Sequence, residues 1–389
     1  MTIIIPSKSR SFTPSIVVST PSWITASNFT DDNLAYGMES YSHTVVATGG
    51  YDTASLTAKM RIREAGRWFT KALGRDFAYY SPQGIKRWQG FINSITVNIG
   101  ALSYTIGPVI DIANRADVLF STKQYNTNPP IGGQETSTGA ANITASQNRY
   151  GIFVTLLNGG SGILAQMEEV RDVFLAENSE PFRDTAASFS ADGEAQIQLE
   201  MLGYYHLLKR YFYSSSTTGT QNASAKISAV LAADPSSRFS SSSLFIETNT
   251  TQVNTAETDN PYAWDVIQNT IAVGDGSGNR MLFGVYNDLV AHYESLPTTV
   301  TRQMLLSDPA QRVESISGAL IYPWDMRPGA WVAVQDFIIG QPQAADLKSD
   351  LRNIMVETVS YTAPFGLSIN GKKVETLPQI MARYGISGI

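Results

Sequence analysis

The sequence has 389 residues, 43% of them hydrophobic and 16% charged, with a net charge of −6 and no cysteine. A chain of this length predicts two or three domains, and a charged fraction below the usual ~25% indicates that partner proteins cover much of its surface. The acidic balance excludes a general nucleic-acid binder. The absence of cysteine excludes thiol catalysis, disulfides and cysteine metal sites, and fits synthesis in a reducing cytoplasm.

The first residues, MTIIIPSKSRSF, have neither the charge order nor the apolar length of a signal peptide. No apolar run approaches the ~20 residues of a membrane span. We therefore expect a soluble chain without stable membrane association.

Residues 1–122 predict a β-rich unit with one helix. Alternating apolar positions predict a bulge near Gly90–Ile92 and a glycine turn at 48–50. Residues 61–73 change to helical spacing, and Gly74 suits the position after a helix C-terminus. The unit favours a small antiparallel barrel or sandwich. Its predicted strands are 16–18, 23–24, 44–47, 54–60, 76–81, 85–99, 102–106 and 114–120.

Residues 123–258 predict an inserted and connecting region. It opens in a long loop or domain boundary, 121–148, that is rich in Ser, Thr, Asn, Gly and Pro. A helix of some four turns begins at Ser161, with Ile163, Met167, Val170 and Phe174 on one apolar stripe, and Asp192-Gly193 marks a turn. Further elements are strands at 150–157 and 197–201, helices at 203–213 and 225–233, and a Ser- and Thr-rich stretch at 236–258.

Residues 259–366 predict a second β-rich unit, and 367–389 a C-terminal tail. Asp259-Asn260-Pro261 is typical of a helix start, and Gly274 ends that helix. A hairpin at 318–340 turns at Pro328-Gly329 between arms at 319–322 and 331–338. The other predicted strands are 282–286, 289–293 and 354–362. Because both β-rich units carry one short helix among several strands, we predict an internal duplication.

Few residues form patterns that predict chemistry. His43, His206 and His292 lack a second histidine at a metal-ligand spacing, which favours packing or surface roles. There is no nucleophile elbow around a serine and no phosphate-binding loop. The segment 274–279 has too few carboxylates for a calcium loop.

The charged clusters also favour structural roles, so we predict no catalytic, cofactor-binding or metal-binding residue. Asp325 and Asp336 flank the 318–340 hairpin, and a glycosidase-like pair stays open there. The acidic residues Glu168, Glu169 and Asp172 lie on the polar side of a predicted helix and indicate a solvated face. The one basic run indicates a helix surface or pairing with acidic residues across an interface. It consists of Arg61, Arg63, Arg67, Lys71 and Arg75.

Aromatic residues are plentiful relative to charges, with 18 tyrosines and 6 tryptophans. Such a balance is typical of protein–protein interfaces. It is also compatible with a carbohydrate-binding surface.

Three sets of residues form a wider pattern. The first is Gly74-Arg75, the run Trp88-Gln89-Gly90-Phe91-Ile92, and Asn114; the second is Leu202-Gly203-Tyr204, Leu207-Leu208 and Gly284-Val285-Tyr286; the third is Gly318, Pro323-Trp324, Arg327-Pro328-Gly329, Asp336, Ile354, Glu357, Val359 and Tyr361. The pattern extends over about three quarters of the chain. It resembles the tail hub proteins (baseplate or tail-tip hubs) of tailed bacteriophages.

This resemblance implies an α+β, β-rich fold with two tail-tube-like antiparallel β-barrel domains and inserted smaller α/β domains. It implies a non-enzymatic homotrimeric ring that adapts the hexameric tail tube to a trimeric spike or tip, with a channel for DNA. The implied partners are a tail tube or distal tail protein, a spike or tail-tip protein and a tape measure protein. The implied location is the virion tail, after synthesis in the host bacterial cytoplasm, and no cofactor is implied.

Other interpretations remain open. The chain could instead be a distal-tail ring or a receptor-binding protein that binds carbohydrate, or an enzyme acting on cell-wall sugars or peptides. If DNA passes through a ring of this chain, a basic lining would hold a duplex with one negative charge per ~1.7 Å. We therefore expect a neutral or acidic lumen, with the Arg61–Arg75 cluster facing partners or solvent.

Overall fold

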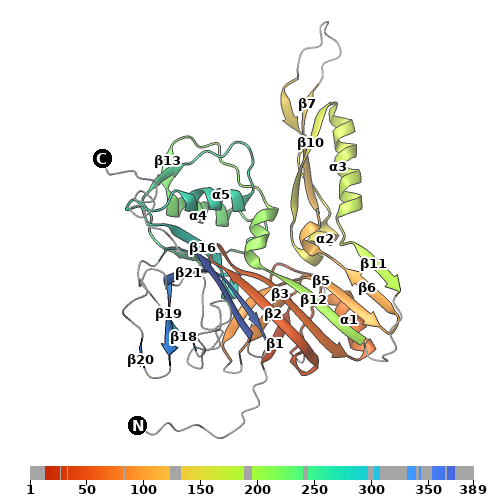
Figure 1. The fold of residues 1–389 in the computed structure, drawn as a ribbon. Helices are drawn as coiled ribbons and strands as arrows, with labels where there is room; N and C mark the ends of the chain where they lie inside the picture. The colour runs from red at the N-terminus through yellow and green to blue at the C-terminus, as the bar shows by residue number, and fades with distance from the viewer. Residues whose placement is uncertain are drawn as a thin grey trace.

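The computed structural model describes residues 14–26, 28–32, 34–81, 84–122, 133–187, 195–239, 244–296, 302–306, 331–338, 341–342, 353–363 and 366–372. Its main feature is a sheet of 16 strands whose central path runs β1-β4-β5-β12-β3-β2-β21-β19-β18 (Figure 1). The fold is β-rich with helices, as the sequence predicts. The strands of the path are β1 (Ser15–Ser19), β2 (Met38–Val46), β3 (Gly49–Met60), β4 (Asp76–Tyr80), β5 (Lys86–Ile99), β12 (Ala195–Gly203), β18 (Arg302–Leu306), β19 (Trp331–Ile338) and β21 (Asn353–Thr362).

The sheet curls so that its separated strands meet on the inner face. Tyr41 on β2 stacks on Tyr79 on β4, with ring centroids 4.1 Å apart, although β3, β12 and β5 lie between these strands in the sheet. Trp88 and Ile92 on β5 are fully buried inside the curl. Alternation of apolar and polar residues along each strand thus supplies an inner core and an outer face.

The single predicted helix of this part is α1 (Ile62–Lys71), and Gly74 adopts a φ of 75° just beyond it. Ala65 and Trp68 turn inward from α1, and the Trp68 ring packs edge-on against Phe29 at 5.1 Å. The positive φ at Gly74 favours glycine because a side chain there would be strained. The helix prediction for 61–73 is confirmed.

The bulge predicted near Gly90–Ile92 lies at Asn93. Ser94 pairs with Glu200 and Ile92 pairs with Met201, so Asn93 is the extra residue on β5. Its Oδ1 accepts a hydrogen bond from the Ile110 backbone N–H at 3.0 Å. The bulge re-aims one side chain and fixes the following loop.

A smaller sheet and two helices form an arm that projects from the curled sheet (Figure 1). The buried Asn114 holds the base of this arm, since its Nδ2 donates to Ser146 Oγ and the Gly151 carbonyl while its Oδ1 accepts from the Phe153 N–H. The arm consists of β7 (Arg115–Thr122), β8 (Glu135–Ser137), β9 (Ala141–Asn142), α2 (Thr144–Tyr150), β10 (Val154–Gly162) and α3 (Leu164–Asn178).

A third part packs two helices on β14, β16 and β17 of the main sheet and includes a separate two-stranded sheet of β13 and β15. The apolar faces of the helices are buried there, and a fully buried ion pair between Arg238 and Asp234 follows α4. The elements are η3 (Tyr204–Arg210), β13 (Thr220–Asn222), α4 (Ala223–Ala232), β14 (Leu244–Ile246), β15 (Gln252–Asn254), α5 (Ala263–Ala272), β16 (Met281–Val285), η5 (Asn287–Leu289) and β17 (Ala291–Ser295).

Two strand pairings join this part and the C-terminal strands to the N-terminal ones. β16 runs parallel to β3, with Gly284 beside Gly49 and Val285 beside Gly50. A Cβ at Gly284 would lie 3.0 Å from the Gly50 Cα, so both backbones approach closely because neither carries a side chain. β2 pairs antiparallel with β21, Ser42 opposite Thr362 and Val46 opposite Thr358.

Several sequence predictions need correction. The expected strand at 23–24 is a turn, in which the Ile24 N–H donates to the Pro21 carbonyl. The helix expected to open at Asp259-Asn260-Pro261 begins at Ala263, because Asn260 has a left-handed φ of 48° and Pro261 pairs with Tyr213 in extended backbone.

The expected long loop 121–148 contains the start of α2, together with β8 and β9. β12 comes from the range expected to be inserted, yet it lies between β5 and β3 in the main sheet. The expected tail begins with a strand, β22 (Gly366–Lys372), paired with β21. The domain boundaries predicted at 122, 259 and 366 remain a prediction.

The hairpin at 318–340 is described only in part. Its second arm is confirmed as β19, while the first arm and the Pro328-Gly329 corner lie outside the described residues, as does the predicted Asp192-Gly193 turn.

Candidate assembly surfaces and polar clusters

His43 lies on β2 within an aromatic cluster. The side chain is buried, its ring centroid lies 5.1 Å from that of Tyr361 and 5.5 Å from that of Tyr41, and burial lowers its pKa to about 3. A neutral, enclosed imidazole of this kind stabilises packing and is not positioned to exchange protons with solvent. His292 packs between Phe245 and Tyr286 in β17, with ring centroids 5.3 and 5.2 Å away.

His206 on η3 forms a cluster that combines an imidazole with a carboxylate. Its Nε2 lies 2.8 Å from Asp52 Oδ1, which also accepts the Tyr205 hydroxyl at 2.6 Å. Lys209 Nζ lies 3.4 Å from His206 Nδ1 and over the rings of Tyr205 and Trp264. Burial opposes ionisation of Asp52, but the hydrogen bonds from His206 and Tyr205 outweigh it and hold the pKa below its usual value.

A second polar cluster fastens η5 to the curled sheet. Gln89 Nε2 donates to both oxygens of Asp76, at 3.1 and 2.9 Å, and its Oε1 accepts from Lys86 and from the Asp288 N–H. Tyr204 also donates its hydroxyl to Asp76, and Lys86 forms an ion pair with Asp288. Burial raises the pKa of Asp76 despite these donors.

Both clusters consist of groups that satisfy one another. The first lacks a serine, threonine or cysteine nucleophile, and the acceptors of the second are already occupied. Among the described residues, no group of three or more His, Asp or Glu side chains could hold a metal ion. The clusters therefore act as polar fasteners between elements.

The other carboxylate candidates are located differently. Asp336 lies in β19, and Asp325 lies outside the described residues, so the proposed pair between them stays untested. In the 274–279 loop, Asp275 accepts hydrogen bonds from the N–H groups of Ser277 and Asn279 at 2.9 and 2.6 Å. Its oxygens close the turn, and the loop contains no second carboxylate that could bind a cation.

The basic cluster predicted from 61 to 75 separates into distinct roles. Arg75 is buried and donates to the backbone carbonyls of Arg149 and Ala26. Arg67 pairs with Asp31 and Glu64 at 3.7 and 3.6 Å. Of the remaining members, Arg63 and Lys71 are exposed on α1, and Arg61 is exposed just before its first residue.

The arm has a small core of its own. Val118, Phe120 and Met167 are its buried cluster, with Leu157 packed against them. Of the apolar stripe predicted on α3, only Met167 is buried, whereas Ile163 and Val170 are about half exposed. The stripe prediction is therefore wrong for most of its members.

No helix in the described ranges is long and apolar enough to cross a membrane.

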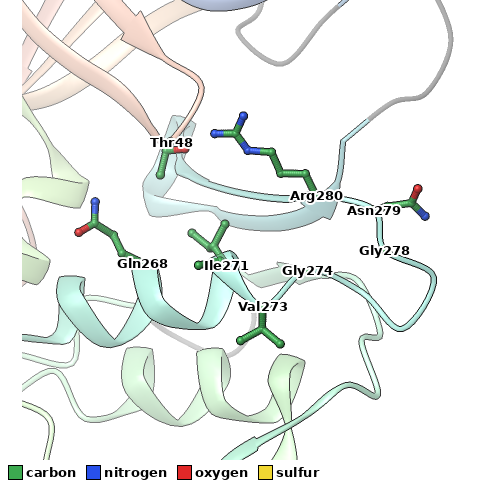
Figure 2. A pocket seen from close by; sticks show the side chains of 9 residues that line it. Thr48, Gln268, Ile271, Val273, Gly274, Gly278, Asn279 and Arg280 are labelled. Carbon is green, nitrogen blue, oxygen red and sulfur yellow. The ribbon is translucent and has the colours of Figure 1, made fainter. Parts of the chain in front are cut away.

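An open recess of about 570 Å³ lies between the end of α5 and the β2–β3 turn. Figure 2 shows Gln268 and Ile271 on α5, with Thr48 and Arg280 facing them from the other side. Its lining among the described residues consists of aliphatic groups, a threonine hydroxyl, two amides and a guanidinium, without a histidine or carboxylate.

Sequence reasoning missed both polar clusters, since Asp52, Asp76 and Gln89 stand far from their partners in sequence. The only signal was the concentration of Tyr204, Tyr205 and His206 in one short stretch.

Comparison with protein-family models and with curated proteins finds no match. Among solved structures, the chain is similar to a tail protein from Neisseria meningitidis MC58, at 8% identity and a TM-score of 0.45, covering 93% of this chain and 97% of that one. It is similar to the 43 kDa tail protein of prophage MuSo2 from Shewanella oneidensis, at 7% identity and a TM-score of 0.45, covering 93% and 96%. A third is a type VI secretion component from E. coli described as structurally similar to bacteriophage tail proteins, at 10% identity and a TM-score of 0.41, covering 87% and 74%.

Proposed function

We propose that this chain is a structural hub of a bacteriophage tail. In this proposal three copies form a ring that adapts a hexameric tail tube to a trimeric spike or tip, and DNA passes through the central channel. The chain performs no catalysis in this role.

The observation that carries the proposal is the pairing of β2 with β21. It joins strands from both ends of the chain into one curled sheet. A hub that offers a six-fold surface from three copies needs two β-rich units in each copy at a fixed spacing. A continuous sheet is a rigid way to fix that spacing, because neighbouring strands share a ladder of backbone hydrogen bonds.

The residues that carry the resemblance to tail hubs support this role through their structural positions. Gly74 ends α1 with a positive φ, Arg75 and Asn114 make buried hydrogen bonds to loop backbone, and Trp88 is fully buried. Each stabilises the shape of the chain, and none is placed to act on a substrate. A protein that works by shape and assembly would retain such residues.

The test is to express the chain with the tube and spike proteins encoded beside it and to purify the complex. We expect three copies of this chain per complex, measured by native mass spectrometry, bound to tube protein on one face and spike on the other. Incubation with peptidoglycan or polysaccharide should release no product. A chain that binds neither tube nor spike but binds cell-surface carbohydrate would instead be a receptor-binding protein, and the hub proposal would be wrong.

A further inference from the structure

The exposed face of α1 carries cations that have no ion-pair partner among the described residues. Arg61, Arg63 and Lys71 are exposed there, and Ile62 beside them is half exposed. The positive surface continues past the helix end into a hollow of about 100 Å³, whose lining includes Arg149 and Arg183. In a chain of net charge −6, this is a local concentration of positive charge.

Gly66 lies at the centre of this exposed face. A Cβ at this position would meet nothing within 4 Å, so no contact inside the chain requires glycine. Glycine within a helix is less stable than alanine, which makes its presence costly unless something outside the chain approaches closely. Thr70, one turn further, is also small and exposed. These two small residues lie near Ile62 and the cations and leave open space above this part of the helix.

The outer face of α3 has the opposite charge and a matching apolar component. The helix contains four acidic residues, Glu168, Glu169, Asp172 and Glu177, against one arginine. That arginine, Arg171, is largely buried and donates to the Gly139 carbonyl within the arm. Val170 and Val173 are half exposed on the side away from the arm sheet. α3 therefore presents valines flanked by carboxylates.

We propose that the outer face of α3 in one copy packs on the exposed face of α1 in the neighbouring copy. Val173 would lie over Gly66, Val170 near Ile62, and Glu169 and Glu177 would face Arg63 and Lys71. Apolar contact would supply most of the affinity, because exposed ion pairs contribute little individually. The charges would select the orientation of the two helices.

This contact joins two different surfaces, so two copies can exchange it only across a two-fold axis, and otherwise one α3 face and one α1 face stay open for further copies. Figure 1 shows α3 on the arm and α1 at the far end of the same side, with β6 (Leu102–Ile106) and β11 (Arg183–Ala187) between them. A contact between unlike surfaces leads from copy to copy and closes into a ring when the rotation divides a full turn. The inference rests on the proposed function, which supplies the count of three copies.

Cysteine cross-linking tests the contact directly, because the chain has no cysteine of its own. We would place Gly66→Cys and Val173→Cys in one chain, assemble it with the tube and spike proteins, and oxidise gently. If α3 packs on α1 around a closed ring, most of the protein should run as a covalent trimer on a non-reducing gel. Each single variant should give monomer and, at most, a small amount of dimer.

The matched control combines Gly66→Cys with Ala232→Cys, which places the second cysteine on an exposed position of α4. It should form no trimer. If the complex contains three copies by mass but the Gly66→Cys, Val173→Cys chain cross-links no better than this control, the proposed contact is wrong and the hub function stands. If the complex does not contain three copies, the proposed function fails first.

Charge reversal provides a second measurement that does not depend on cysteine geometry. Arg63→Glu should reduce incorporation of the chain into complexes at least tenfold, as should Glu169→Arg. The double variant should regain most of the loss, because the pair is restored with its signs exchanged. The contact would be contradicted if the two reversals together reduced incorporation by the product of their single effects, or if neither reversal alone reduced it.

Discussion

His43 is enclosed by the rings of Tyr41, Tyr79 and Tyr361, and its stability contribution depends on pH. Burial lowers the pKa of His43 from 6.5 to about 3. Between these values the unfolded chain binds a proton at this residue and the folded chain does not. The free energy of unfolding should therefore fall as pH drops from about 6.5 toward 3, by about 1.4 kcal/mol per pH unit.

His43→Gln should remove that component of the pH dependence, measured as the unfolding free energy from denaturant titrations across this range. The control is Tyr41→Phe in the same cluster, since the Tyr41 hydroxyl is buried and has no hydrogen-bond partner among the described residues. Tyr41→Phe should keep the slope and leave stability equal or up to about 1 kcal/mol higher. A His43→Gln chain with the wild-type slope would show that other groups produce it.

The ion pair between Arg238 and Asp234 is fully buried, with Nε to Oδ distances of 3.1 and 2.9 Å. Arg238→Leu would leave a buried carboxylate unpaired and should cost about 3–5 kcal/mol of unfolding free energy. The double variant with Asp234→Asn removes that charge as well and should be more stable than Arg238→Leu alone. Chemical unfolding of Arg238→Leu, Asp234→Asn and the double variant checks this, and additive losses would contradict the buried-charge explanation.

At the scale of elements, the sequence predicted most helices and strands but not how they join. The α1 and α3 helices and the β2–β3 hairpin follow from local periodicity, which depends only on residues near in sequence. The junctions do not: β12 enters the main sheet from a distant segment, and Asp52 meets His206 only because η3 packs on β3. Such contacts depend on tertiary packing, for which one sequence carries little local signal.

A substitution at Gly66 should have opposite effects on the stability of the isolated chain and on ring assembly, because there is open space around this residue. Gly66→Ala should raise the unfolding free energy of the isolated chain by ~0.5–1 kcal/mol, because alanine favours the helix. The same change should weaken ring assembly, because a methyl group would take up the open space at Gly66 over which Val173 of the neighbouring copy is proposed to lie. Gly276→Ala, another glycine with open space around it, is the control and should leave assembly unchanged.

A substitution at Gly284 tests the parallel pairing of β16 with β3, which joins the third part of the chain to the N-terminal strands. Gly284→Val would place a Cβ 2.8 Å from the Tyr286 ring and 3.0 Å from the Gly50 Cα. We expect a loss of about 1–3 kcal/mol in unfolding free energy, since the strands would have to separate. Thermal unfolding compared with the Gly276 control measures it, and an unchanged melting temperature would argue against this close approach.

At the scale of the whole molecule, three features favour a protein that assembles with other copies: a low charge density, half-exposed valines on α3, and opposite charges on α1 and α3. Arg61, Arg63 and Lys71 have no ion-pair partner among the described residues. The resemblance to tail hubs supplies the three-fold count, and the β2–β21 pairing supplies the rigid connection within one copy. In this arrangement the cations of α1 face a neighbouring copy. The channel lining is then free of them, as passage of DNA requires.

The most direct measurement is electron microscopy of an assembled tail containing this chain. The account predicts a ring of three copies between tube and spike, with a neutral or acidic channel and with Arg61, Arg63 and Lys71 turned away from it. A ring of six copies, or a channel lined by Arg61, Arg63 and Arg67, would contradict it.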